Sequence, residues 1–477
     1  MSNLIRIITD EWRYWARSRL GVVIVIAGLA LTVVSAVLSV NDMVAAGHHR
    51  THMQAEADAR FYQQPDRHPH RMVHYGHYAF RIPPPLSIVD PGLDAITGST
   101  IFLEGHRQNS AMFAERKSKA NLAIFESFTP AFVVQKLAPL LLILLGYNVI
   151  SRERETRAFD QMVAQGIPPT RILAAKGFAL AAAAGLMLVP LAVAAIISIG
   201  RGESTAVVAL FVTGYALYLG IWCALIVSVS TLARSRSTSL GILLALWTFL
   251  SLLLPPLSSS IASSSVNMPG KIETDFAVIT AKQKVGDGHN AADPAFLDLK
   301  GKLLQQYQVE SVEQLPMNFR GVVAGVAETE LTEILNRFAE QRMQFEIGQS
   351  HVARAFGWLS PVLSVREFSM TLAGVDLETH HRFLRETEKL RFNFVQSLNE
   401  LQAQKLTYLD DINRSRDAES EKRTRIDAQN WALLNEFRFE VAPSEERIAA
   451  TFAPLLKLLI WFTIAIGLCA NFARRSI

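Results

Sequence analysis

Histidine is concentrated in one stretch of this sequence. Seven of the twelve histidines fall between positions 48 and 77, and imidazole nitrogen is a good ligand for copper, zinc and nickel. His48 and His52 are four residues apart and would share a helical face, and His74 and His77 are separated by two residues, a spacing usable for metal ligation. The pattern predicts a copper or zinc site that uses His48, His49, His52, His74 and His77.

Two other interpretations of these histidines stay open. They are also consistent with a polar stretch beside a membrane, in which histidine has no special role, or with a pH sensor. The sequence contains no HExxH or CxxC motif, and its two cysteines, Cys223 and Cys469, lie inside apolar blocks. A later pair, His380 and His381, falls on a predicted long helix, where we expect solvated or packed side chains.

A second chemically distinctive stretch is "SRERETRAFDQMVAQGIPPTRILAAK", residues 151–176, which separates two apolar blocks. It holds five basic and three acidic residues. One interpretation is a solvated link whose cations simply mark the cytoplasmic side of a membrane. The other is a short helix that carries force from a soluble motor to the membrane. The length and the Gly-Ile-Pro-Pro corner favour the second.

Several classes of function lack their motifs. The sequence has no GxxxxGK[ST] phosphate loop and no GxSxG nucleophile motif. The apolar blocks carry almost no charge, which disfavours an intramembrane enzyme or a proton-coupled transporter. The net charge of +4 gives no sign of nucleic-acid binding. We therefore expect no catalytic residue and no cofactor in this chain.

The elements that would position these residues are transmembrane helices, since the apolar residues gather in blocks of about 20. The predicted spans are 20–40, 131–150, 172–199, 206–232, 239–258 and 452–471. Basic residues concentrate in 1–19, 151–171, the link before 239 and the tail 472–477, so these segments and both termini are expected in the cytoplasm. The predicted fold class is an all-α membrane protein with six transmembrane helices.

Two large segments, 41–130 and 259–450, would then lie in the periplasm and be mainly helical. Apolar residues at helical spacing predict long amphipathic helices over 325–355 and 376–410, the second capped by Asp376. They would pack on each other as a hairpin or form a docking surface for another protein. Between them, we expect 356–375 to form a helix at the membrane surface.

The charged stretch resembles the first cytoplasmic loop of type-2 ABC exporter permeases. The matching parts are the "RERE" run, a hydrophobic stretch over 159–163, the "GIPP" corner and the return over 171–176. The start, "NLIRIITDEWRYWARSR", resembles the connecting helix of the same family. The stretches "HYGHYAFRIPPPLSIVDPGLDAITGSTIFLEGHRQN" and "LSPVLSVREFSMTLAGVDLETHHRFL" resemble a bacterial permease subfamily whose outer region is a domain of unknown function. That subfamily is distantly similar to the permease that helps mature the copper sites of nitrous oxide reductase.

The resemblance implies a coupling helix over 151–171 that docks on a separate ABC ATPase, which would hold ATP and magnesium. The residues expected to couple are Arg152, Glu153, Arg154, Glu155, Arg157 and Gly166. It further implies a location in the bacterial inner membrane, with a lipid bilayer around the spans. Its implied protein partners are a second permease chain, either an identical copy or a paralogue, and a periplasmic partner protein. The alternative is a membrane-anchored protein that binds metal or assembles a metallocentre through its histidine-rich segment.

Overall fold

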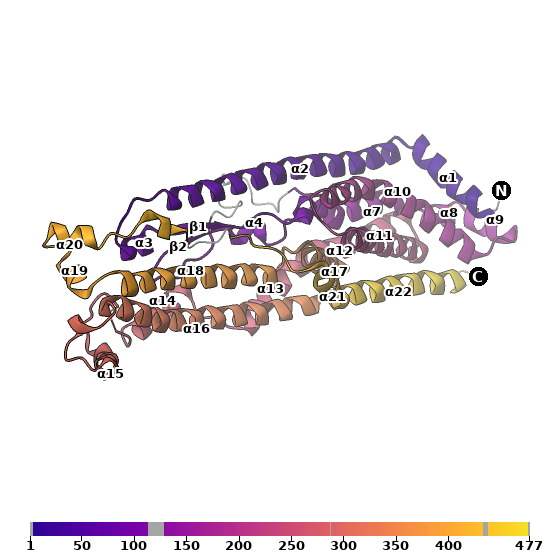
Figure 1. Ribbon diagram of the computed structural model, residues 1–477. Coiled ribbons are helices and arrows are strands. Elements are labelled where there is room, and N and C mark those ends of the chain that lie inside the picture. Colours follow the sequence, from indigo (N-terminus) through magenta and orange to yellow (C-terminus); the bar gives the residue numbers. More distant parts are fainter. Residues whose placement is uncertain (1–2, 113–127, 287, 433–436, 476–477) are drawn as a thin grey trace.

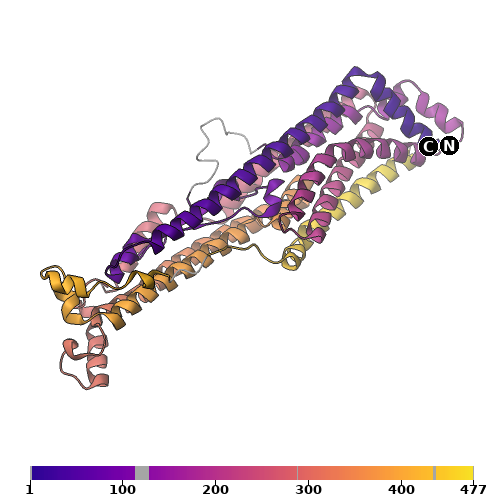
Figure 2. The same ribbon diagram turned by 45° about the horizontal axis from the view of Figure 1, so that its top comes forward.

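The computed structural model describes residues 3–112, 128–286, 288–432 and 437–475. Parts of four predicted segments, 1–19, 41–130, 259–450 and 472–477, lie outside the described residues. The molecule is elongated, with a helical bundle at one end and a helical extension at the other (Figure 1). Both termini lie at the far end of the bundle (Figures 1 and 2). The prediction of an all-α membrane protein is confirmed.

Six helices or helical runs are long and apolar enough to cross a membrane, and each predicted span falls within one of them, apart from the exact ends. They are α2 (Arg19–Tyr62), the run from α6 (Pro130–Phe132) through a π-helical turn (Val133–Leu137) and α7 (Ala138–Gly146) to α8 (Ser151–Glu155), α10 (Pro169–Ile199), α11 (Thr205–Leu232), the run from α12 (Arg236–Thr248) through a second π-helical turn (Phe249–Leu253) to α13 (Leu254–Ser265), and α22 (Phe452–Arg475).

The core of the bundle is formed by α7, α10 and α11. Their apolar side chains, among them Leu142, Leu180 and Trp222, are fully buried and belong to one continuous cluster. The apolar faces of α2, of α22 and of the run from α12 to α13 are much less covered. Val23 of α2, Leu253 of the π-helical turn after α12 and Ile464 of α22 are at least half exposed. Apolar surface of this extent suits lipid or another apolar surface better than water.

The N-terminal helix α1 (Asn3–Arg17) lies across the end of the bundle and packs against α10 and α2. Ser18 separates α1 from α2, and its hydroxyl accepts a hydrogen bond from the amide of Gly21. The helix α2 continues unbroken past the predicted end of the first span at residue 40 and forms one side of the extension (Figure 1).

The extension contains the predicted amphipathic hairpin. Its helices are α16 (Phe319–Ala355) and α18 (Leu377–Lys405), which pack against each other along their length. Asp376 caps α18 as predicted, because its Oδ1 accepts from the amide of Thr379 at 3.0 Å. Between them, α17 (Pro361–Ala373) packs against α11 and α22 at the junction of bundle and extension.

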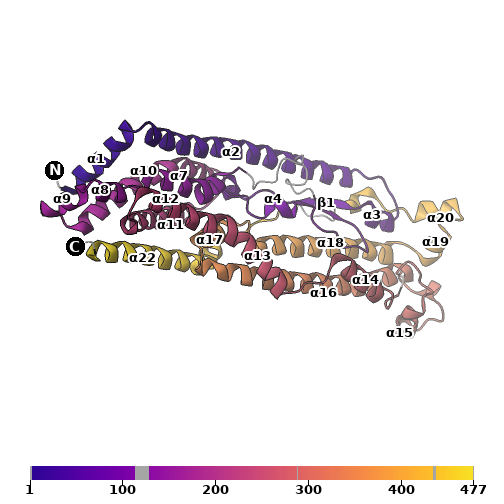
Figure 3. The ribbon, with the colours of Figure 1, turned by 180° about the vertical axis from the view of Figure 1, so that it is seen from behind.

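Smaller elements complete the extension. They are α3 (Pro69–Tyr75), α4 (Asp94–Thr97), α14 (Lys271–Lys282), α15 (Leu297–Tyr307), α19 (Tyr408–Asn413), α20 (Ala418–Arg423) and α21 (Ser444–Ala450). Seen from behind, α13 and α14 lie along α16 (Figure 3). The strands β1 (His77–Phe80) and β2 (Thr100–Leu103) form an antiparallel hairpin in which His77 faces Leu103.

Candidate functional site

The charged connection between the second and third spans lies at the end of the bundle that holds both termini (Figure 1). The prediction of one helix over 151–171 is wrong, because the structure has two shorter helices there. The connection comprises α8 and α9 (Ala158–Ala164), separated by Arg157 in the left-handed conformation with φ of 59°. Gly166, with φ of 83°, ends α9. Pro169 forces the preceding residue into an extended conformation and opens α10.

A buried cluster of four charges ties this connection to α1 and α10. Glu11 of α1 is 1% exposed. Its Oε2 accepts from Lys176 Nζ at 2.5 Å and from Arg152 Nη2 at 2.9 Å. Lys176 also pairs with Glu153. Two carboxylates and two cations thus neutralise each other, which burial of charge requires. We call Glu11, Arg152, Glu153 and Lys176 the clasp.

Neighbouring contacts fix the same connection to the fourth and fifth spans. Arg154 donates to the carbonyl oxygen of Thr231 at the end of α11. Glu155 accepts from the backbone amide of Arg236 at 2.8 Å and also pairs with its guanidinium. The connection, which continues the second span, therefore contacts α1 and the nearby ends of the third, fourth and fifth spans.

The predicted coupling residues divide into two groups. Arg152, Glu153 and Arg154 are turned toward the protein and make the contacts above. Glu155, Arg157 and Gly166 are exposed, together with residues that the prediction omitted, namely Asp160, Gln161, Gln165 and Arg171. A solvent-facing surface of α9 and its flanking turns is thus held in place by charges on its other side. We call Arg157, Asp160, Gln161, Gln165 and Arg171 the outer face of the connection.

The histidines of the predicted metal site do not come together. His48, His49 and His52 are exposed on α2. His77 is buried at the start of β1, where its Nε2 lies 2.9 Å from Asp58 Oδ1. Of the predicted set, His74 alone lies in a cluster of histidines among the described residues. The prediction assumed that histidines close in sequence lie close in space. His48, His49 and His52 instead lie on the long helix α2, whereas His74 lies on α3.

The cluster that does form contains His70 and His74 of α3, His106 in the turn after β2, and His289 in the loop after α14. One ring nitrogen from each lies within 4.8 Å of the others. The Nε2 atoms of His70 and His74 are 3.1 Å apart. Burial, and then the neighbouring histidines, lower the pKa of His70 to about 2, and the same causes lower the pKa of His74. These two rings are therefore neutral near pH 7, the form in which imidazole binds metal.

His70, His106 and His289 were not among the predicted ligands. His70 lies within the dense stretch, so local density pointed to it. His106 and His289 each follow a glycine, in "EGHR" and "DGHN". A glycine-histidine pair in two separate loops is a weak signal of chain segments brought close together.

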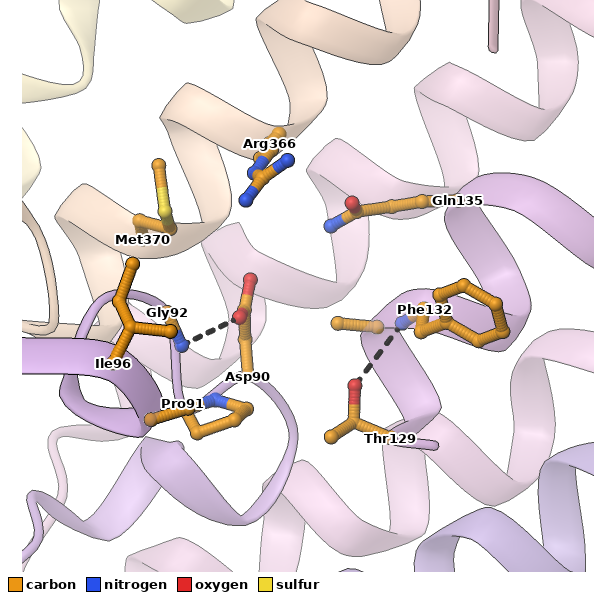
Figure 4. A pocket seen from close by; sticks show the side chains of 11 residues that line it. Asp90, Pro91, Gly92, Ile96, Thr129, Phe132, Gln135, Arg366 and Met370 are labelled. Carbon is orange, nitrogen blue, oxygen red and sulfur yellow. Dashed lines mark hydrogen bonds between the residues drawn. The ribbon is translucent and has the colours of Figure 1, made fainter. Parts of the chain in front are cut away.

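A small cavity of about 70 Å³ lies at the junction of bundle and extension. Its lining includes Asp90, Thr129, Gln135, Arg366 and Met370. The guanidinium of Arg366 and the carboxylate of Asp90 point toward each other across it, and Gln135 points in from the opposite wall (Figure 4). The cavity thus has polar groups of both charges where α17 meets the spans.

A directed chain of hydrogen bonds connects this cavity with the bundle. Ser369 Oγ donates to Asp90 Oδ2 at 2.5 Å, so its only hydroxyl proton is used there. Tyr215 must then donate to Ser369, 2.9 Å away, and it accepts from Gln135 Nε2 at 2.7 Å. The chain joins α11, α17 and the π-helical turn before α7.

Comparison with known families identifies one segment. A family model described as a domain of unknown function (DUF3526) matches residues 275–440. No curated protein matches the chain. The matched part spans α14 to α20 and so includes the α16–α18 hairpin. The expectation of a domain of unknown function is confirmed for this segment.

Proposed function

We propose that this chain is the membrane-spanning permease subunit of an ABC transporter, driven by ATP hydrolysis on a separate subunit. The observation that supports it is the braced connection. Its outer face is free to meet a partner, while the clasp on its inner side joins it to α1 and α10. A solvated link would not need buried charged residues to hold it against the bundle. Burying charges costs free energy of desolvation, so their presence here favours a connection that must be held in place.

The clasp also suggests how movement would pass from the motor to the spans. An ATPase that closes on binding ATP would displace α9. Because Glu11 and Lys176 are bonded to the connection, α1 and α10 would move with it rather than independently. Arg154 and Glu155 would carry the same displacement to α11 and α12.

The remaining parts of the chain fit this assignment. The weakly covered apolar faces of α2, α12 and α22 would contact lipid and a second permease chain, identical or paralogous. The end with both termini would lie in the cytoplasm of a bacterial cell and the extension in the periplasm. We further propose export as the direction, with the cavity at Asp90 and Arg366 near the outer end of the path and the extension meeting a periplasmic partner protein.

The test is purification of the tagged chain from its host in mild detergent, followed by mass spectrometry and ATPase assay. We expect an ABC-type ATPase at about one copy per chain. The variant Arg157→Glu/Arg171→Glu reverses two exposed cations on the outer face. The amount of ATPase that co-purifies with it should be lower than for the wild type by about tenfold or more. Its fold should be retained because neither side chain is buried.

The matched control is Lys271→Glu/Lys302→Glu. It makes the same change in net charge on exposed residues of α14 and α15, at the opposite end of the molecule. The control should keep the ATPase. Absence of any ATPase from the wild-type chain, or equal loss in both variants, would refute the proposal.

A further inference from the structure

We propose that His70, His74, His106 and His289 bind one divalent transition-metal ion of the class that prefers imidazole, which comprises Zn²⁺, Cu²⁺ and Ni²⁺. The inference is independent of the transport proposal. All six pairs of rings among these histidines have centroids between 4.7 and 5.9 Å apart. Four side chains that converge in this way supply a full set of nitrogen ligands.

The distances need little adjustment to hold an ion. Metal–nitrogen bonds of about 2.0–2.1 Å in a tetrahedral site place the ligand nitrogens about 3.3 Å apart. His70 Nε2 and His74 Nε2 are already separated by 3.1 Å, and no chosen pair in the cluster exceeds 4.8 Å. Small rotations of the more exposed rings, His74 and His289, would bring the set together.

A carboxylate orients one of the ligands from behind. His106 Nδ1 lies 2.9 Å from Glu328 Oε2 of α16. The other ring nitrogen, Nε2, is buried and has no hydrogen-bond partner among the described residues. A histidine that gives one nitrogen to a carboxylate and presents the other to a cluster of ligands has the arrangement of metal-binding histidines.

The carboxylate is itself fixed in place. Arg391 of α18 is 1% exposed, and its Nη1 donates to Glu328 Oε1 at 2.6 Å. Arg391 also donates to Thr332 and pairs with Glu388. Burial raises the pKa of Glu328, but the bonds from His106 and Arg391 outweigh it and lower the pKa below its ordinary value. Arg391 thus fixes the carboxylate that lies against His106 Nδ1.

Close backbone contacts bring the three ligand-bearing segments together. His106 has the left-handed conformation, with φ of 64°, which costs free energy in a residue other than glycine. A Cβ on Gly105 would clash with Val73 of α3. A Cβ on Gly288 would lie 2.7 Å from Ala327 of α16. These glycines let the turn and the loop approach α3 and α16.

The site would join the two outer segments of the chain. Three ligands come from the segment before the second span, whereas His289 comes from the segment after the fifth. A bound ion would therefore fasten the loop after α14 to α3 and the β-hairpin. Loss of His289 alone would leave three histidines that all come from the first outer segment, with one ligand position open.

The test uses the full-length chain in detergent, stripped with a chelator and dialysed against Zn²⁺, Cu²⁺ or Ni²⁺, with Mg²⁺ as a fourth arm. Metal is measured by mass spectrometry, and the thermal unfolding midpoint is measured with and without each ion. We expect one ion per chain for at least one of the three imidazole-preferring metals, none for Mg²⁺, and a higher unfolding midpoint with the bound ion.

Variants separate this site from the other histidines. His70→Ala/His74→Ala should abolish binding, and Glu328→Gln should weaken it roughly 10–100-fold by disturbing the orientation of His106. The control His48→Ala/His49→Ala/His52→Ala removes three exposed histidines of α2 and should bind like the wild type. If the double variant fails to fold, His289→Ala, a change in an exposed loop residue, should weaken binding in its place.

Two outcomes would overturn the proposal. One is a wild-type chain that holds no more metal than His70→Ala/His74→Ala or, where that variant does not fold, than His289→Ala. The other is loss of the ion in His48→Ala/His49→Ala/His52→Ala, which would assign the metal to the histidines of α2 instead.

Discussion

Glu11 and Lys176 form a buried ion pair, with Oε2 and Nζ 2.5 Å apart, although 165 positions separate them in the chain. The pair joins the N-terminal helix to the start of the third predicted span. Arg152 and Glu153 complete it from the connection between spans. The clasp is thus the point at which three separate segments of the chain are held to one another.

Removal of one charge from the clasp should destabilise the protein. In Glu11→Gln, Lys176 and Arg152 would share a single carboxylate, that of Glu153. Loss of one partner from a buried ionic group costs roughly 3–5 kcal/mol. We expect a lower thermal unfolding midpoint in detergent and faster proteolysis near α1.

The neighbouring residue provides the control for this change. Asp10 is exposed and pairs only with exposed Arg13 among the described ion pairs. Asp10→Asn should change stability little, because exposed ion pairs contribute at most about 1 kcal/mol. Equal midpoints for the two variants would show that the clasp does not support the fold.

A second prediction concerns the contact between α11 and α17. The ring of Phe368 lies so close to Gly214 that a Cβ there would overlap it. Gly214→Ala should therefore push α17 away from the bundle and lower stability by about 1–3 kcal/mol. Thermal unfolding in detergent measures the effect.

Gly185 offers a matched comparison, because it lies inside α10 and a Cβ there would meet no atom within 4 Å. Gly185→Ala should be neutral or stabilising, since alanine favours a helix by about 1 kcal/mol over glycine. A Gly214→Ala variant as stable as Gly185→Ala would contradict the tight packing of α17.

A third prediction is a pH dependence that arises from His380 of α18. Burial, followed by the nearby Arg81 and His381, lowers the pKa of His380 to about 4. In the unfolded chain this histidine takes up a proton near its ordinary pKa of about 6.5. Between these two values the unfolded state binds more protons, so the free energy of unfolding falls as the pH decreases from 6.5 to 4, by up to about 3 kcal/mol.

The measurement is the thermal unfolding midpoint from pH 7 to pH 5 for the wild type, His380→Gln and His351→Gln. His380→Gln should show a shallower decline than the wild type. His351 is exposed on α16, and its replacement should leave the decline unchanged. Parallel curves for all three proteins would exclude His380 as the source.

The spans and the α16–α18 hairpin could be predicted because their signals are local. Blocks of apolar residues mark the spans, and helical spacing together with Asp376 marks α18. The end of α2 could not be placed, since its polar half continues the same helix without a residue that stops it before Tyr62. Helix length outside a membrane depends on what the helix packs against.

The candidate sites were only partly predictable. The charged connection was located, but the direction in which Arg152 and Glu153 point depends on Glu11, which lies 141 positions from Arg152 in the sequence. The histidine cluster likewise depends on Glu328 and on two loops that approach α3. Sequence density selected His48, His49 and His52 of α2, which are exposed.

The unbroken length of α2 has a mechanical consequence. At about 1.5 Å per residue, its 44 residues form a rod about 66 Å long, more than twice the hydrocarbon thickness of a bilayer. One end adjoins α1 at Ser18, and the other leads into α3 with His70 and His74. A tilt of about 5° at the Ser18 end would carry the far end sideways by about 6 Å. A continuous helix of this length would act as a lever arm, turning a small displacement at one face of the membrane into a large one at the tip.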